Sequence, residues 1–120
     1  MSARVVLVHD EAEFIQNATE HLLRVGYDVV SYDDSMAALN AIEATDGVDL
    51  VITRVGMPAG TPNGISLFQV LRNTRPRLVV VFVGHPDREQ FTDGIGELVP
   101  HPVDLDLLTE AVGRALEGRG

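Results

Sequence analysis

The chain has 120 residues, a formal net charge of −9 at pH 7 and no cysteine, which suits a single domain over 1–120 and excludes disulfides and thiolate chemistry. The acidity and the absence of lysine and tryptophan argue against nucleic-acid binding, which needs clustered cations and stacking aromatic side chains. No apolar run approaches the roughly 20 residues that span a bilayer, and no secretory leader is recognisable, so we expect a cytoplasmic domain without a membrane partner.

The first part of the chain alternates between strand and helix patterns. Short apolar runs at 4–8 and 28–32 have the length of buried strands. Between them apolar residues recur at helical spacing up to Gly26, a frequent type of helix stop, so a helix is predicted. Its buried face is expected to contain Phe14, Ile15, Ala18, Leu22 and Val25.

The middle of the chain contains the run that best fits a central strand. Residues 48–54 are mostly apolar and β-branched and end in Arg54, which suits a strand buried on both faces by helices. A helix is predicted before it over 36–44, with the polar residues 33–35 as caps. A loop rich in Gly and Pro follows at 59–64, and then a third helix. The expected buried side of this helix consists of Ile65, Phe68, Val70 and Leu71.

The remaining chain contains two further strand patterns. Residues 78–83 form a fourth apolar run, and 97–99 form a brief fifth strand expected at the edge of the sheet. The stretch 87–94 has Phe91 as its one large apolar residue, so we expect a short, loosely held helix there. Asp104 is expected to cap a final helix. The inner stripe of that helix is expected to contain Leu105, Leu108, Val112, Ala115 and Leu116.

Five strand-helix units predict an α/β fold. We expect a five-stranded parallel sheet of order 2-1-3-4-5, doubly wound with five helices as in flavodoxin. The carboxyl ends of parallel strands meet at one edge, where ligands bind in such folds. That edge gathers the one candidate site, which consists of His9, Asp10, Arg54, His85 and His101.

Several stretches at these strand ends carry a resemblance to a known family. They are residues 5–11, 49–54 with 57–58, 63–64, 82–86 and 99–102. Over nearly its whole length the chain resembles a receiver domain of two-component response regulators, of the chemotaxis-receiver type. The resemblance implies a phosphoryl group taken from a histidine kinase onto an aspartate after strand three. It also implies Mg²⁺ on two acidic residues after strand one, a hydroxyl after strand four and a lysine after strand five.

This chain departs from the family pattern at nearly every one of these positions. The resemblance puts Arg54 at the phosphoacceptor, His9 and Asp10 at the acidic pair, Val83 or Gly84 at the hydroxyl, His101 at the lysine, and Leu98 at the aromatic residue three positions earlier that reports activation. Asp10 alone keeps the family's residue type.

The replacements predict a domain that does not accept a phosphoryl group. Arginine is a permanent cation, so Arg54 cannot act as the nucleophile and disfavours Mg²⁺ beside it. We predict instead a charge-assisted bond between Arg54 and Asp10, with one or two hydrogen bonds, and neither enzymatic activity nor a cofactor. The expected function is an atypical receiver that binds a protein, such as a histidine kinase, an output protein or a second copy. The expected contact face is formed by the fourth helix, fifth strand and fifth helix.

Three alternatives stay open at this point. His9, His85 and His101 with Asp10 have the residue types of a transition-metal site, although Arg54 stands among them. Arg54 and His101 could instead bind a small anion or a nucleotide phosphate, which would make the domain a sensor. Finally, a non-standard aspartate, Asp10 or Asp49, could accept the phosphoryl group.

Overall fold

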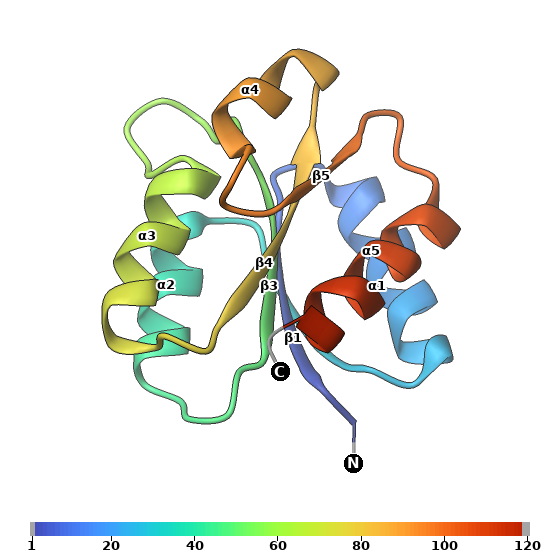
Figure 1. Cartoon of the computed structure of the whole chain (residues 1–120), viewed down its shortest axis with the longest axis horizontal. Helices are drawn as coiled ribbons and strands as arrows, with labels where there is room; N and C mark the ends of the chain where they lie inside the picture. Colours follow the sequence, from blue (N-terminus) through green and yellow to red (C-terminus); the bar gives the residue numbers. More distant parts are fainter. Residues whose placement is uncertain (1, 119–120) are drawn as a thin grey trace.

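Strands and helices alternate along the chain in the computed structural model, which describes residues 2–118 (Figure 1). The elements in order are β1 (Arg4–Val8), α1 (Ala12–Val25), β2 (Asp28–Tyr32), α2 (Ser35–Glu43), β3 (Leu50–Arg54), α3 (Gly64–Thr74), β4 (Val79–Gly84), a 3₁₀ turn (Pro86–Arg88), α4 (Glu89–Thr92), β5 (Glu97–Pro100) and α5 (Leu105–Gly118).

The five strands form one parallel sheet of order β2-β1-β3-β4-β5. Helices α1 and α5 cover one face, and α2 and α3 cover the other (Figure 1). The predicted flavodoxin-like fold with five helices is confirmed, and so is the edge position of β5. Within residues 2–118, no helix is both long and apolar enough to cross a membrane.

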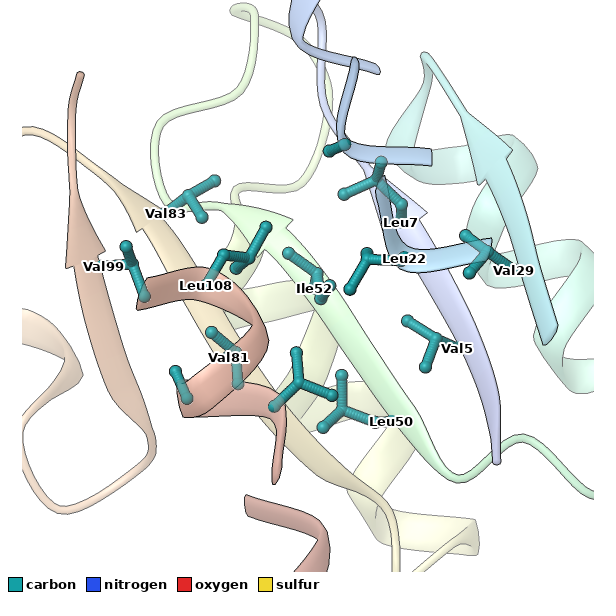
Figure 2. Packing of buried hydrophobic residues seen from close by; sticks show 13 residues of the cluster. Val5, Leu7, Leu22, Val29, Leu50, Ile52, Val81, Val83, Val99 and Leu108 are labelled. Atoms are coloured by element: carbon teal, nitrogen blue, oxygen red, sulfur yellow. The ribbon is translucent and has the colours of Figure 1, made fainter. Parts of the chain in front are cut away.

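Alternate residues of the central strands build the two halves of the core. On one face Leu50 and Ile52 pack against Leu22 of α1 and Leu108 of α5, all fully buried (Figure 2). On the other face Val51 belongs to the cluster that α2 and α3 cover. Full burial of each such side chain contributes about 1.5–3 kcal/mol. The apolar runs therefore hold β3 in the middle of the sheet.

Side chains cap the helices where the sequence offers them. Asp34 accepts hydrogen bonds from the backbone N–H groups of Met36 and Ala37 at the start of α2. Asp104 accepts from those of Asp106 and Leu107 at the start of α5, which confirms its predicted role. Each such cap is worth about 1 kcal/mol.

Two residues that were expected on buried helix faces are half exposed. Val25 is 51% exposed because it is the last residue of α1, and the chain turns away at Gly26, whose φ of 116° is left-handed. Val70 is also 51% exposed, because the buried stripe of α3 runs through Leu67 and Leu71. A residue directly before Leu71 is rotated about 100° around the helix axis from it, which turns Val70 toward solvent.

Helix α4 is as short as its composition indicated. It has four residues, follows directly on the 3₁₀ turn, and contains one buried residue, Thr92. Its large apolar residue, Phe91, is 52% exposed. The helix therefore adds little to the core on the face of the sheet that α2 and α3 cover.

Candidate functional site

The carboxyl ends of β1 and β3 lie side by side and bring Asp10 next to Arg54. Val8 pairs with Thr53 in the parallel register, so Arg54, the last residue of β3, stands beside the chain that leaves β1. On its other side Arg54 pairs with Val83 of β4. The site therefore lies at the edge of the sheet where the strand pattern predicted it.

A direct ion pair joins the two central residues of the site. Nη1 of Arg54 donates a hydrogen bond to Oδ1 of Asp10 at 2.5 Å, and the same nitrogen lies 3.7 Å from Oε1 of Glu11. The predicted pairing of Arg54 with Asp10 is confirmed, as a bond through one guanidinium nitrogen. Both side chains are about one third exposed, so solvent screens the attraction in part.

The guanidinium keeps the Asp10 carboxyl in its charged form. Partial burial by itself would raise the pKa of Asp10, but the hydrogen bond and the positive charge of Arg54 outweigh burial and lower this pKa below its ordinary value of 3.8. Asp10 is therefore an anion, and the guanidinium of Arg54 is the positive charge beside it.

His9, the other residue of the acidic-pair position, belongs to the interior. It is 4% exposed, and its ring lies 4.3 Å from the ring of Phe14, measured between centroids. Its Nδ1 accepts the backbone N–H of Glu11 at 3.1 Å, so that nitrogen carries no proton. Burial lowers the pKa of His9, and the charge of Arg54 lowers it further. The ring is thus a neutral part of the β1–α1 junction.

Neither candidate for the hydroxyl position offers an oxygen. The side chain of Val83 is fully buried in the core cluster that α1 and α5 cover, and Gly84 has no side chain. The hydroxyl of Thr53, which precedes Arg54 in the sequence, is buried and donates to the carbonyl oxygen of Arg54 at 3.1 Å. That hydroxyl stabilises the end of β3.

The residues that follow β4 and β5 divide between the site and its surroundings. His101 is exposed, and its backbone N–H bonds to Gly84 at 2.8 Å; its charge contributes to lowering the pKa of His9. Leu98, at the position of the switch aromatic, packs partly buried against the core on the α2 and α3 face. His85 is 67% exposed and its Nδ1 accepts the N–H of Asp87 in its own turn.

The alternative metal site of three histidines and Asp10 is not formed. Among residues 2–118, no group of three or more His, Asp and Glu side chains is arranged to hold a metal ion. The donor set also does not suit Mg²⁺, which prefers several oxygen ligands. The carboxylate of Asp10 is bonded to Arg54, and Nδ1 of His9 is bonded to the chain.

A glycine at the start of α3 supports the end of β3. The N–H of Gly64 donates to the carbonyl oxygen of Val55 at 2.9 Å, and Asn63 caps the helix by accepting the N–H of Ser66 at 2.8 Å. A side chain at Gly64 would collide with the carbonyl oxygen of Arg54. The Asn-Gly pair therefore lets α3 begin directly against the site.

Two contributors to the site were not identified from sequence. Glu11 was not among the candidate site residues, yet it adds a second carboxylate near Arg54. Phe14 was assigned to the core, and it also holds the ring of His9. A signal for Phe14 exists in hindsight, because an aromatic residue in the first turn of a helix can reach back to the strand end before it.

The order of the sheet and the position of the site define a doubly wound α/β domain with its functional edge at the carboxyl ends of β1 and β3. Residues 5–112 match the family model of the response regulator receiver domain. The chain belongs to this family, the receiver domains of two-component signalling.

Individual relatives agree with this assignment. The chain is 30% identical over 124 residues to the response regulator protein FleR of Pseudomonas aeruginosa, a match that covers 99% of this chain and 26% of FleR. NtrX from Brucella abortus has a similar structure, with a TM-score of 0.87 and 25% identity over 99% of this chain and 28% of NtrX. A receiver protein from Sinorhizobium medicae, at 22% identity, shares the fold with a TM-score of 0.88 over 99% of this chain and 98% of its own. The chain thus spans about a quarter of the length of FleR and NtrX.

Proposed function

We propose that this chain is an atypical receiver domain that accepts no phosphoryl group and acts by binding another protein. The observation that carries the proposal is the bond between Arg54 and Asp10. Phosphoryl transfer to a receiver needs a carboxylate in line with phosphorus and a divalent cation that neutralises the developing charge. Here a guanidinium stands at the acceptor position and binds the one acidic residue that the family pattern retains.

The proposal includes no enzymatic activity and no resident cofactor. The electrostatics support this, because the guanidinium already neutralises Asp10, and a divalent cation placed beside it would meet another positive charge. The domain would then hold one conformation of the site in place of a phosphorylation-driven switch. The expected cytoplasmic location is part of the same proposal.

Partners are inferred from the family. Receiver domains interact with histidine kinases or output proteins, and we propose a partner of this kind or a second copy of the chain. The expected contact is the face formed by α4, β5 and α5. In this chain that face combines a four-residue helix with a four-residue edge strand.

The alternative phosphoacceptors have less support from their surroundings. Asp10 is bonded to Arg54. The carboxylate of Asp49 accepts the backbone N–H of Arg4 at 2.8 Å, just before β3 begins. Five residues of strand, or about 16 Å, separate Asp49 from Arg54 and from the edge where family members carry out phosphoryl transfer.

Intact-mass measurement after treatment with acetyl phosphate and Mg²⁺ tests the proposal. We expect no species heavier by one phosphoryl group. A phosphorylated species that disappears in Asp10→Asn or in Asp49→Asn would overturn the proposal and identify the acceptor. An active receiver domain treated in parallel serves as the positive control for the reagent.

A thermal-shift titration with inorganic phosphate and with ATP tests the sensor alternative. The carboxylates of Asp10 and Glu11 beside the guanidinium oppose the binding of an added anion, so we expect no saturable rise in melting temperature. A saturable rise that Arg54→Gln abolishes would instead identify an anion sensor.

A further inference from the structure

A groove lies between α3 and the edge of the sheet formed by β4 and β5. Two adjoining hollows of about 250 and 310 Å³ make up this groove and share three lining residues, Phe68, Arg72 and Ile95. The first hollow extends over Val80 to Arg114 of α5, and the second extends along α3. We call this feature the α3–β5 groove.

The groove exists because β5 and α4 are both short. The first residue of β5, Glu97, pairs with Val81, so Val79 and Val80 precede the first paired position. Helix α4 has four residues and lies at the end of the sheet where the strands terminate, away from the start of β4 (Figure 1). Gly96 passes so close to Val80 that a side chain there would collide with it, and Ile95 is partly buried. Val80 and Phe68 are themselves buried, so the apolar surface that the groove offers comes from the partly buried side chains of Val79, Ile95 and Ala115.

The walls of the groove combine apolar surface with one available cation. The guanidinium of Arg72 lies 5.7 Å above the ring of Phe68, and its Nε donates to the carbonyl oxygen of Pro76 at 2.8 Å. Among the residues that the structure describes, no carboxylate lies within 4.0 Å of Arg72. The other cation, Arg114, is bound to both carboxylate oxygens of Glu97. Arg72 is therefore the charge that an incoming group would meet.

We propose that the α3–β5 groove binds a short acidic segment of a partner protein, with an aliphatic or aromatic side chain against Ile95 and a carboxylate on Arg72. The charge of the groove favours this occupant, because a guanidinium without a carboxylate partner beside apolar surface complements a carboxylate next to an apolar side chain. On a chain with a net charge of −9, this local cation also directs such a segment to one place. The inference rests on the proposed function, in which the domain acts through its surface, and it extends the contact beyond the α4, β5 and α5 face to α3.

A display selection of short random peptides against the purified domain tests the proposal. We expect enriched peptides to contain Asp or Glu next to Leu, Ile or Phe. Synthetic copies should bind Arg72→Glu about tenfold more weakly by fluorescence anisotropy, because the charge at the contact is reversed. Arg77→Glu makes the same charge change at an exposed position outside the groove and should leave the Kd within about twofold. Basic enriched peptides, no enriched peptides, or equal binding to Arg72→Glu would overturn the proposal.

Two further measurements cover the cases that the variant cannot decide. Amide shift mapping on the wild-type domain should place the peptide at Phe68, Arg72, Ile95 and Gly96 even where Arg72→Glu does not fold, and shifts confined elsewhere would overturn the groove. Sedimentation should give the same oligomeric state for the wild-type domain and for Arg72→Glu. A dimer that Arg72→Glu dissociates would identify a second copy as the occupant and overturn the acidic partner segment. The two proposals can fail separately. Phosphorylation of the chain would overturn the proposed function but would not change the result of the peptide-binding measurement.

Discussion

Asp10 and Arg54 are 44 residues apart in sequence, and a hydrogen bond of 2.5 Å joins them across the carboxyl ends of β1 and β3. The bond ties the β1–α1 junction to the central strand. The same junction contains the buried ring of His9, so the β1–α1 junction connects the ion pair to the core. The pair is therefore a local structural link at the place where relatives carry out phosphoryl chemistry.

A double-mutant cycle of Asp10→Asn and Arg54→Gln is expected to give a coupling energy of about 1 kcal/mol, because both side chains are partly exposed and screened. Urea unfolding of the four proteins measures it. The more exposed pair Arg4 and Asp28 is a matched comparison and should couple more weakly. Equal coupling in the two pairs would contradict a special role for the Asp10 bond.

The same bond predicts loss of stability in acid. The pKa of Asp10 is lowered on folding, so the unfolded chain binds a proton first as the pH falls through 3.8. The stability contributed by ionised Asp10 is complete above that pH and disappears as the pH falls through the folded-state pKa. Asp10→Asn should remove this part of the pH dependence of the unfolding free energy, and an unchanged curve would argue against it.

The lowered pKa of His9 predicts a second loss of stability as the pH falls, in a pH range above that of Asp10. Burial lowers its pKa below the ordinary value of 6.5, so the unfolded chain takes up a proton that the folded chain does not. Stability should fall as the pH drops below 6.5, by at most about 1.4 kcal/mol per pH unit. His9→Asn retains an acceptor and does not titrate, so its unfolding free energy should change less between pH 7 and 5 in urea denaturation. A slope identical to that of the wild type would show that His9 is not responsible.

Replacement of Gly64 by alanine should cost more than about 2 kcal/mol. The new Cβ would collide with the carbonyl oxygen of Arg54, a backbone atom at the end of β3 that cannot move freely. Gly113→Ala in α5 is the control, since no atom lies near its Cβ position, and this change should stabilise the domain by about 0.5–1 kcal/mol. Thermal or urea unfolding separates the two, and similar effects of both changes would refute the steric argument.

Arg75 closes the carboxyl end of α2 from outside that helix. Its Nη2 donates to the carbonyl oxygens of Ile42 at 2.7 Å and Glu43 at 3.1 Å, two of the last carbonyl groups of α2, of which that of Ile42 also accepts the N–H of Thr45. Arg75→Ala should therefore destabilise the domain by about 1–2 kcal/mol. Arg77→Ala removes an exposed arginine two residues away and should change the unfolding free energy by less than about 0.5 kcal/mol. Equal losses would mean that net charge, and not the cap, is responsible.

Restoring the family's aspartate at position 54 is expected not to restore phosphoryl transfer. Arg54→Asp supplies a carboxylate, but the hydroxyl position still offers Val83 or Gly84 and the lysine position still holds His101. Intact-mass measurement with acetyl phosphate and Mg²⁺ should show no added phosphoryl group. A phosphorylated Arg54→Asp protein would show that residue 54 alone prevents the reaction.

Much of the site was predictable from strand ends, because a run such as 48–54 identifies both a buried strand and Arg54, the residue at its carboxyl end. Arg54 and Asp10 were paired because they have opposite charges and follow strands that end at the same edge of the sheet, and the pairing is present. His9 was placed correctly at the edge, but its burial could not be read from sequence, since it depends on the ring of Phe14 in the first turn of α1. His85 was grouped with the site, but the bond between its ring and the N–H of Asp87 keeps it in its own turn.

Periodicity and residue type by themselves determined the five strands, their parallel arrangement and the cation at position 54, because those properties follow from local apolar patterns that any fold must bury. Tertiary structure alone decided that Arg75 closes α2 and that the start of β4 has no strand beyond it. Both features depend on contacts between segments distant in sequence. Such contacts come from packing geometry, which no local pattern encodes.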